Sequence, residues 1–317
     1  MGGDNNMAFY DNKGNLLNYP IKWFLTQEQV NEGVRYFCEN GGIVNGHYNY
    51  DIAFFGDSLT FGLNGGGVTY PAVMANVLGA SHINMGVSGA TTFDIACTQG
   101  GTHAVLPANT DLNEPFPLTD NYGKGLFPQY ASKAQGLFYN KEELSITHDD
   151  YINWKLSNSE TLTSPRYIYT GFSANVSYKS MVIFLGTNDV LNSINSDTTL
   201  YLNVIRDMVR KYGGKQYIIV GLFGDDIKYD TYCSVLKEHF GSKYFNSKQY
   251  LSKYATYDAI NQGLLNESVL TDDVLNSINS GIVPSTMKSD PVHLNAVGYR
   301  MLGQKLAEKF LALGYQP

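Results

Sequence analysis

Cysteine is scarce in this sequence, and its placement excludes two kinds of small scaffold. The chain has three cysteines, Cys38, Cys97 and Cys233, which are odd in number and widely spaced. They form neither a disulfide framework nor a Cys-x-x-Cys metal-binding pair. We therefore expect three buried side chains that pack as small hydrophobic groups.

Long apolar runs and a leader-like N-terminus are also missing. No stretch approaches the length of a transmembrane helix. The chain begins Met-Gly-Gly-Asp-Asn-Asn, without the basic region and the apolar core of a signal peptide. We expect a soluble protein with no transmembrane segment. The compartment stays open, an extracellular one included, because an export signal could be absent from this chain.

Positive charge is in short supply. Lys and Arg total 22 against 29 Asp and Glu, which gives a formal net charge of −7. An acidic chain without a basic run is a poor partner for nucleic acid or for an anionic membrane surface. The histidines outside the motifs described below lack any H-E-x-x-H or H-x-H spacing, so we expect no metal site from them. These histidines are His47, His82, His103, His148 and His239.

Apolar material, in contrast, is sufficient for a large core. Hydrophobic residues make up 43% of the 317 positions, which suits one large α/β domain or one domain with substantial additions. Short apolar runs alternate with helical patterns, as a parallel sheet requires. The runs predict strands at 51–56, 81–85, 181–185 and 216–222, and a weaker one at 244–250. The helical patterns include a helix carrying Val73, Met74 and Val77 and helices near 197–212 and 295–313.

The first of these strands leads directly into a serine. It reads Asp-Ile-Ala-Phe-Phe-Gly-Asp-Ser over residues 51–58. An apolar run this short, bounded by Gly, is typical of a strand buried on both faces. Ser58 then lies just past the carboxyl end of the strand, where open α/β sheets bind their ligands. Ser58 is therefore a candidate nucleophile, although Asp-Ser after a strand is also a common helix cap.

Three further motifs carry groups that a nucleophilic serine needs. Asp290 and His293 lie three apart in a Pro-containing loop, so the carboxylate can orient one imidazole nitrogen while the other faces the serine. Asn188 follows the strand at 181–185 and can offer its amide N–H to an oxyanion. Gly89 follows the strand at 81–85, and its backbone N–H can approach a ligand closely.

These four motifs, in this order, resemble the SGNH hydrolases, also called the GDSL esterase/lipase family. The resemblance covers about residues 51–313 and implies a three-layer α/β/α sandwich with a flavodoxin-like parallel sheet. It also implies that Ser58 is the nucleophile, activated by His293 and Asp290, with no metal or organic cofactor. The oxyanion hole would be formed by N–H groups of Ser58, Gly89 and Asn188. No catalytic position of the family is substituted.

Neighbouring polar and glycine-rich positions fit structural roles better than chemical ones. Asp57 and Asp189 are expected to bind backbone groups near their turns rather than to act as catalytic acids. The glycine-rich stretch 62–67 lacks the Lys-Ser/Thr of a phosphate-binding loop, so we expect a flexible wall of the site.

Two segments exceed the family's minimal domain. Residues 1–50 predict a hairpin near 9–16 and a helix after Thr26, either as a small extension packed on the main domain, 51–317, or as the end of a preceding module. A long insert occupies about 100–178, since Gly89 and Asn188 lie 99 positions apart.

The insert suggests a substrate. It is polar but rich in Tyr and Trp, and its aromatic rings could stack on sugars or could form the insert's own small core. Since it leaves the catalytic edge of the sheet, we expect a lid or side wall over Ser58. This favours a short acyl ester, acetyl above all, on a small molecule or glycan. A lipase or thioesterase acting on longer chains remains an alternative, as does a non-catalytic carbohydrate-binding module on the same fold.

Overall fold

The computed structural model describes residues 48–98, 176–191, 198–211 and 216–317, together with Asn109 and short strands between residues 104 and 170. Its centre is a five-stranded sheet in which every neighbouring pair is parallel. The strands, in spatial order, are β13 (Tyr244–Phe245), β12 (Gln216–Val220), β11 (Val176–Phe184), β1 (Tyr48–Gly56) and β2 (His82–Gly86). Counted along the chain, this is the flavodoxin-like order 2-1-3-4-5, so the predicted fold is confirmed.

The middle of the sheet is apolar on both of its faces. In β1, Ile52, Ala53, Phe54 and Phe55 are each at most 1% exposed. The same holds for the inner part of β11, which pairs with β1 over eight positions. Strands that bury both faces need apolar residues at successive positions, because helices cover each side of the sheet. This explains the continuous apolar runs of the sequence.

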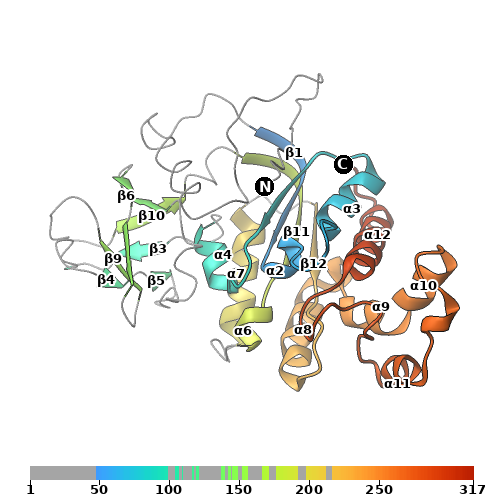
Figure 1. The fold of residues 1–317 in the computed structure, drawn as a ribbon. Helices are drawn as coiled ribbons and strands as arrows, with labels where there is room; N and C mark the ends of the chain where they lie inside the picture. The colour runs from blue at the N-terminus through green and yellow to red at the C-terminus, as the bar shows by residue number, and fades with distance from the viewer. Residues whose placement is uncertain are drawn as a thin grey trace, which may run out of the picture.

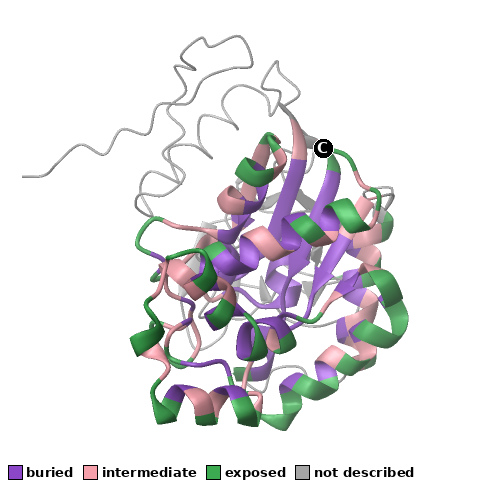
Figure 2. Ribbon diagram, turned by 90° about the vertical axis from the view of Figure 1, so that its right-hand side faces the viewer, coloured by how far each residue is buried: buried purple, intermediate pink, exposed green. Residues whose placement is uncertain are grey.

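Helices form the two outer layers (Figure 1). On one face α3 (Tyr70–Leu78) packs against α12 (Ala296–Ala312); on the other, α7 (Thr198–Lys211) lies between α4 (Thr92–Thr98) and α8 (Ile227–Phe240). Figure 2 shows the buried strands between helices whose outer surfaces are exposed. The predicted apolar stripe of α7 faces the sheet, with Val204, Ile205 and Met208 fully buried.

The region after β12 differs from the prediction. The strand expected at 244–250 stops at Phe245, because the Asn246 side chain accepts a hydrogen bond from the Gln249 backbone N–H and starts a helix. That helix opens a small helical lobe. The lobe contains α9 (Ser247–Lys253), α10 (Ala255–Asn261) and α11 (Asp272–Ser280), with 3₁₀ turns η2 (Gly241–Lys243) before it and η3 (Glu267–Val269) within it.

The predicted insert contains short antiparallel strands in two further sheets. One sheet has the order β5 (Thr119–Asp120), β3 (Ala104–Leu106), β10 (Arg166–Thr170), β6 (Leu137–Tyr139) and β7 (Glu142–Glu143). The other has the order β4 (Phe116–Pro117), β9 (Ile152–Lys155) and β8 (Ser145–His148). The side chains of the insert's aromatic residues up to Tyr169 are not among the parts that the structure describes, and neither are the predicted hairpin and helix within residues 1–47.

One cysteine can be compared with its prediction. Cys233, expected to be buried, is half-buried on α8, where its thiol lies 3.2 Å from the Leu222 backbone N and 3.4 Å from the Leu222 carbonyl oxygen. Cys233 thus packs against the core as predicted, but it is only partly buried, and its thiol also contacts the Leu222 backbone. Cys38 and the side chain of Cys97 lie outside the described residues.

Candidate active site

The pairing register of three strands brings the predicted motifs to one edge of the sheet. Gly56, the last residue of β1, pairs with Phe184 of β11 on one side and with Gly86 of β2 on the other. Ser58 comes two residues after Gly56, Asn188 four after Phe184 and Gly89 three after Gly86. Because parallel strands end at the same edge, the three motifs meet there.

Ser58 is the first residue of the short helix α2 (Ser58–Phe61). Asp57 caps this helix, since its Oδ1 accepts a 2.9 Å hydrogen bond from the Leu59 backbone N–H. Ser58 is 4% exposed, and its Oγ lies 2.9 Å from His293 Nε2. Gly56 must be a glycine here, because a Cβ would overlap the Thr60 side chain and the Phe184 carbonyl oxygen.

Asp290 and His293 belong to one tight turn before α12. The Oδ1 atom of Asp290 accepts hydrogen bonds of 2.7 Å from the backbone N–H groups of Val292 and His293. Its Oδ2 atom lies 2.8 Å from His293 Nδ1. Burial opposes ionisation of Asp290, but the backbone and ring of His293 and the backbone of Val292 outweigh it and lower its pKa to about 2. Ser58, His293 and Asp290 thus form a continuous hydrogen-bonded chain.

The two other predicted site residues lie at the same edge and are connected to each other. Gly89 has a φ of +77°, a left-handed conformation that glycine adopts without strain. Asn188, 9% exposed at the start of α6 (Thr187–Leu191), donates a 2.8 Å hydrogen bond from Nδ2 to the Ala90 carbonyl oxygen. This bond holds Asn188 against the Gly89 loop.

Two buried carboxylates support these loops. Asp189 Oδ2 accepts hydrogen bonds from the Thr92 backbone N–H at 2.8 Å and from the Thr92 hydroxyl at 3.1 Å. Asp57 is fully buried, and this burial, with a smaller contribution from the charge of Asp189, raises its pKa to about 7. Asp57 binds the backbone of its own turn, as predicted from the sequence, whereas Asp189 binds Thr92 on the loop after Gly89, 97 positions away.

One polar residue that touches the predicted acid was not expected from the sequence. Asn64 donates a hydrogen bond of 2.8 Å from its Nδ2 to Oδ2 of Asp290. It has a φ of +63°. An asparagine among glycines is a signal for a left-handed turn position, but nothing in the sequence indicates which partner its side chain meets.

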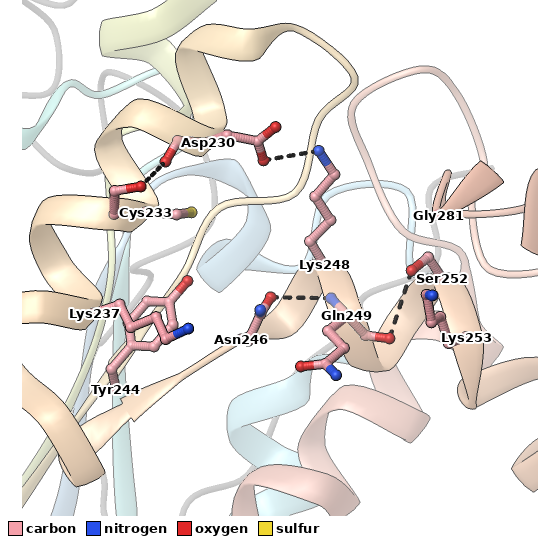
Figure 3. Close-up of a pocket in the computed structure, with 11 residues that line it drawn as sticks. Asp230, Cys233, Lys237, Tyr244, Asn246, Lys248, Gln249, Ser252, Lys253 and Gly281 are labelled. Atoms are coloured by element: carbon pink, nitrogen blue, oxygen red, sulfur yellow. Dashed lines mark hydrogen bonds and ion pairs between the residues drawn. The ribbon is translucent and has the colours of Figure 1, made fainter.

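A hollow of about 420 Å³ lies elsewhere, between α8, β13 and α9 (Figure 3). Its lining includes Asp230, whose carboxylate pairs with Lys248 at 2.9 Å, and the thiol-bearing Cys233. None of the predicted site residues contributes to it.

Within the described residues, no group of three or more His, Cys, Asp or Glu side chains is arranged to hold a metal ion. Of the helices that the structure describes, none has the length and hydropathy needed to cross a membrane.

Residues 52–306 match the sequence model of the GDSL-like lipase/acylhydrolase family. The match spans most of the chain, so this protein belongs to that family and is a carboxylic ester hydrolase by class. Among curated proteins, none matches the sequence.

Solved structures resemble the chain only distantly. A G-D-S-L family protein from Desulfitobacterium hafniense is 12% identical, with coverage of 82% of this chain and 98% of that one and a TM-score of 0.43. A catalytic mutant of an acetylxylan esterase from Geobacillus stearothermophilus is 13% identical, with 86% and 97% coverage and a TM-score of 0.41. An acetyl xylan esterase from Butyrivibrio proteoclasticus is 13% identical, with 86% and 66% coverage and a TM-score of 0.38. At this distance the likenesses carry no information about the substrate of this chain.

Proposed function

We propose that this protein is a serine esterase in which Ser58 is the nucleophile. The observation that carries the proposal is the hydrogen-bonded chain from Ser58 Oγ through the His293 ring to Asp290. His293 Nε2 takes the Ser58 proton as Oγ attacks the ester carbonyl, and Asp290 holds the ring in the required tautomer. His293 then protonates the leaving alcohol. Water releases the acyl group by the reverse sequence.

The tetrahedral oxyanion is stabilised by N–H donors at the same edge of the sheet. In this proposal they are the backbone N–H groups of Ser58 and Gly89 and the side-chain amide of Asn188. The left-handed conformation of Gly89 and the bond from Asn188 to Ala90 support it, because both pre-position donors before the substrate binds.

The direct test is the Ser58→Ala variant assayed with p-nitrophenyl acetate. We expect kcat to fall by at least about 10⁴-fold, because removal of a triad nucleophile leaves only the oxyanion hole and binding to act. The melting temperature should stay close to that of the wild type. Full turnover by the variant would overturn the serine mechanism, and an inactive wild type on every ester would favour a non-catalytic carbohydrate-binding module.

The substrate proposed is a short acyl ester, acetyl in the first place, on a carbohydrate. The support is the composition of the insert at about 100–178, which mixes Tyr and Trp with hydrogen-bonding residues and contains no long apolar run. A lipid site would need a contiguous apolar patch, on the order of several hundred Å². Sugar rings bind instead to aromatic faces flanked by polar groups.

Two measurements test the substrate. A panel of p-nitrophenyl esters from acetyl to palmitoyl, assayed beside acetylated xylan, should show highest kcat/KM for the short acyl groups. Replacing the insert by a Gly/Ser linker should then reduce turnover of the acetylated glycan much more than that of p-nitrophenyl acetate, because only the glycan needs a remote binding surface. Preference for long chains would instead support the lipase or thioesterase alternative. Equal loss of both activities would mean that the insert supports the triad itself.

A further inference from the structure

Asn64 connects the loop after the nucleophile to the carboxylate of the acid–base turn. Its Nδ2 donates to Oδ2 of Asp290 at 2.8 Å, across 226 positions of the sequence. The same oxygen faces His293 Nδ1 at 2.8 Å, while Oδ1 is occupied by the backbone of Val292 and His293. Among the described residues, Asn64 is therefore the one hydrogen-bond partner of Asp290 that lies outside its own turn.

The backbone around Asn64 is held firmly in place. The N–H groups of Gly62 and Leu63 both donate to the Ser58 carbonyl oxygen at 3.0 Å, so the loop starts from the nucleophile itself. The Leu63 carbonyl oxygen accepts a 2.9 Å bond from the hydroxyl of Tyr299, whose side chain is fully buried. A Cβ at Gly65 would overlap the Val68 carbonyl oxygen and approach the Tyr299 ring. The flexible wall predicted for this stretch is thus a braced turn at Leu63 and Gly65.

The backbone conformation of Asn64 determines the direction of its side chain. With a φ of +63° it is in the left-handed region, where asparagine is tolerated much better than residues with bulky side chains. Two residues further on, Gly66 has a φ of +59°, but a Cβ added there would meet no atom within 4 Å. Both positions have a left-handed backbone, which Gly66 adopts without strain. Only Asn64 has a side chain that reaches the site.

We propose that Asn64 is a positioning residue that holds the Asp290 carboxylate in the plane required by His293, and so sets the ring against Ser58. The inference rests on the proposed triad function. The Asn64 amide donates to the same oxygen that faces the His293 ring and ties the acid–base turn to the loop that follows Ser58. Without the amide, the carboxylate keeps its two backbone bonds to Oδ1, but the turn loses its link to that loop, and the distance from Nε2 to Ser58 Oγ is less restricted.

Two substitutions at position 64 separate the effect of the side-chain amide from the effect of the left-handed backbone. Asn64→Gly keeps the left-handed conformation and removes the donor. We expect kcat for p-nitrophenyl acetate to fall about tenfold with KM little changed, as for the loss of one hydrogen bond to a charged group that positions the catalytic groups. Asn64→Asp keeps the size but replaces the donor by a second carboxylate. Because negative charge favours the imidazolium form, the acid limb of kcat/KM should move to higher pH, by about 0.5 to 1 unit.

Gly66→Ala is the matched control. It places strain at a left-handed position of the same turn but leaves the Asn64 amide intact. It should lower the melting temperature while leaving the pH profile of kcat/KM and the kcat as in the wild type. A Gly66→Ala variant that reproduced the Asn64→Gly kinetics would assign the effect to loop strain and overturn the inference.

The outcomes distinguish this inference from the proposed function. If Ser58→Ala is inactive but both Asn64 variants keep wild-type kcat and an unmoved acid limb, Asn64 has no positioning role and the triad stands. If Ser58→Ala is fully active, the triad itself is wrong. A fall in kcat for Asn64→Gly with KM unchanged, absent from Gly66→Ala, supports the inference, because loop strain alone would affect both variants; the pH shift of Asn64→Asp follows from its added charge and shows only that position 64 lies near the ring.

Discussion

The turn that carries Ser58 and the turn that carries Asp290 and His293 meet at one 2.9 Å hydrogen bond, but they differ in burial. Around the serine, Asp57, Leu59 and Thr60 are at most 1% exposed. The side chains of Asp290 and His293 are 33% and 18% exposed. The serine turn is thus part of the core, whereas the acid–base turn is held at the surface by hydrogen bonds, most of them within itself.

Because the two turns differ in burial, we expect substitutions in them to affect stability and activity differently. Substitutions beside Ser58 should disturb packing and therefore the free energy of unfolding, while substitutions in the acid–base turn should act mainly on turnover. Exposed hydrogen bonds contribute less to stability than buried apolar contacts, because water can replace the lost partner.

Asn188→Ala tests whether this buried side chain contributes to catalysis rather than to packing. We expect kcat for p-nitrophenyl acetate to fall by about 10²–10³-fold, as when one oxyanion donor is lost. KM should change little, because the interaction strengthens only in the transition state. Steady-state kinetics checks this. An unchanged kcat would show that the Asn188 amide does not contact the oxyanion.

Leu59→Ala tests how much packing of the buried turn that carries Ser58 contributes to stability. Leu59 is 1% exposed, so its truncation should lower the free energy of unfolding by about 2–5 kcal/mol. The comparison variant is Val292→Ala in the half-buried acid–base turn, for which we expect a loss of less than about 1 kcal/mol. Urea unfolding of both variants measures the difference. Equal losses would remove the contrast between the two turns.

Asp57→Asn tests the buried carboxyl group. The folded-state pKa of Asp57 is raised to about 7, so its contribution to stability is fully present below its unfolded pKa and is lost as the pH rises towards 7. Asparagine keeps an oxygen that can accept from the Leu59 N–H but cannot ionise. The free energy of unfolding of the variant, relative to wild type, should therefore increase by about 2 kcal/mol between about pH 5 and pH 8. A pH-independent difference would contradict the shifted pKa.

Ser289→Ala should have the smallest effect. The Ser289 hydroxyl donates to the carbonyl oxygens of His293 at 3.2 Å and Leu294 at 3.3 Å, but the residue is exposed. The backbone N–H of Ser289, which donates to the His293 carbonyl oxygen at 3.0 Å, is kept in the variant. We expect kcat to fall no more than about threefold and stability by less than about 1 kcal/mol. A large loss of activity would mean that the surface turn depends on this hydroxyl.

The elements predicted best are those in which the residue types and their spacing reflect burial. The apolar runs of β1, β11 and β12 and the stripe of α7 were recognisable because burial on both faces, or on one helical face, requires apolar residues at regular spacing. The helix α8 was not predicted, although Tyr229, Tyr232, Leu236 and Phe240 are buried along it. Two of these four residues are tyrosines, which are weaker indicators of a buried face. The strand at 244–250 was wrong beyond Phe245 because a local Asn246 cap decided the structure.

By itself, the sequence determined the α/β fold, the family and the identity of the candidate residues Ser58, Gly89, Asn188, Asp290 and His293. Motifs of this kind are local, so their residue types and spacing can be recognised without coordinates. Only the tertiary structure decided which groups touch. The contacts of Asn64 with Asp290 and of Thr92 with Asp189 join positions 226 and 97 apart. Such pairs depend on strand register and on how the loops at one edge of the sheet pack. Neither can be derived from residue types and their spacing along the chain.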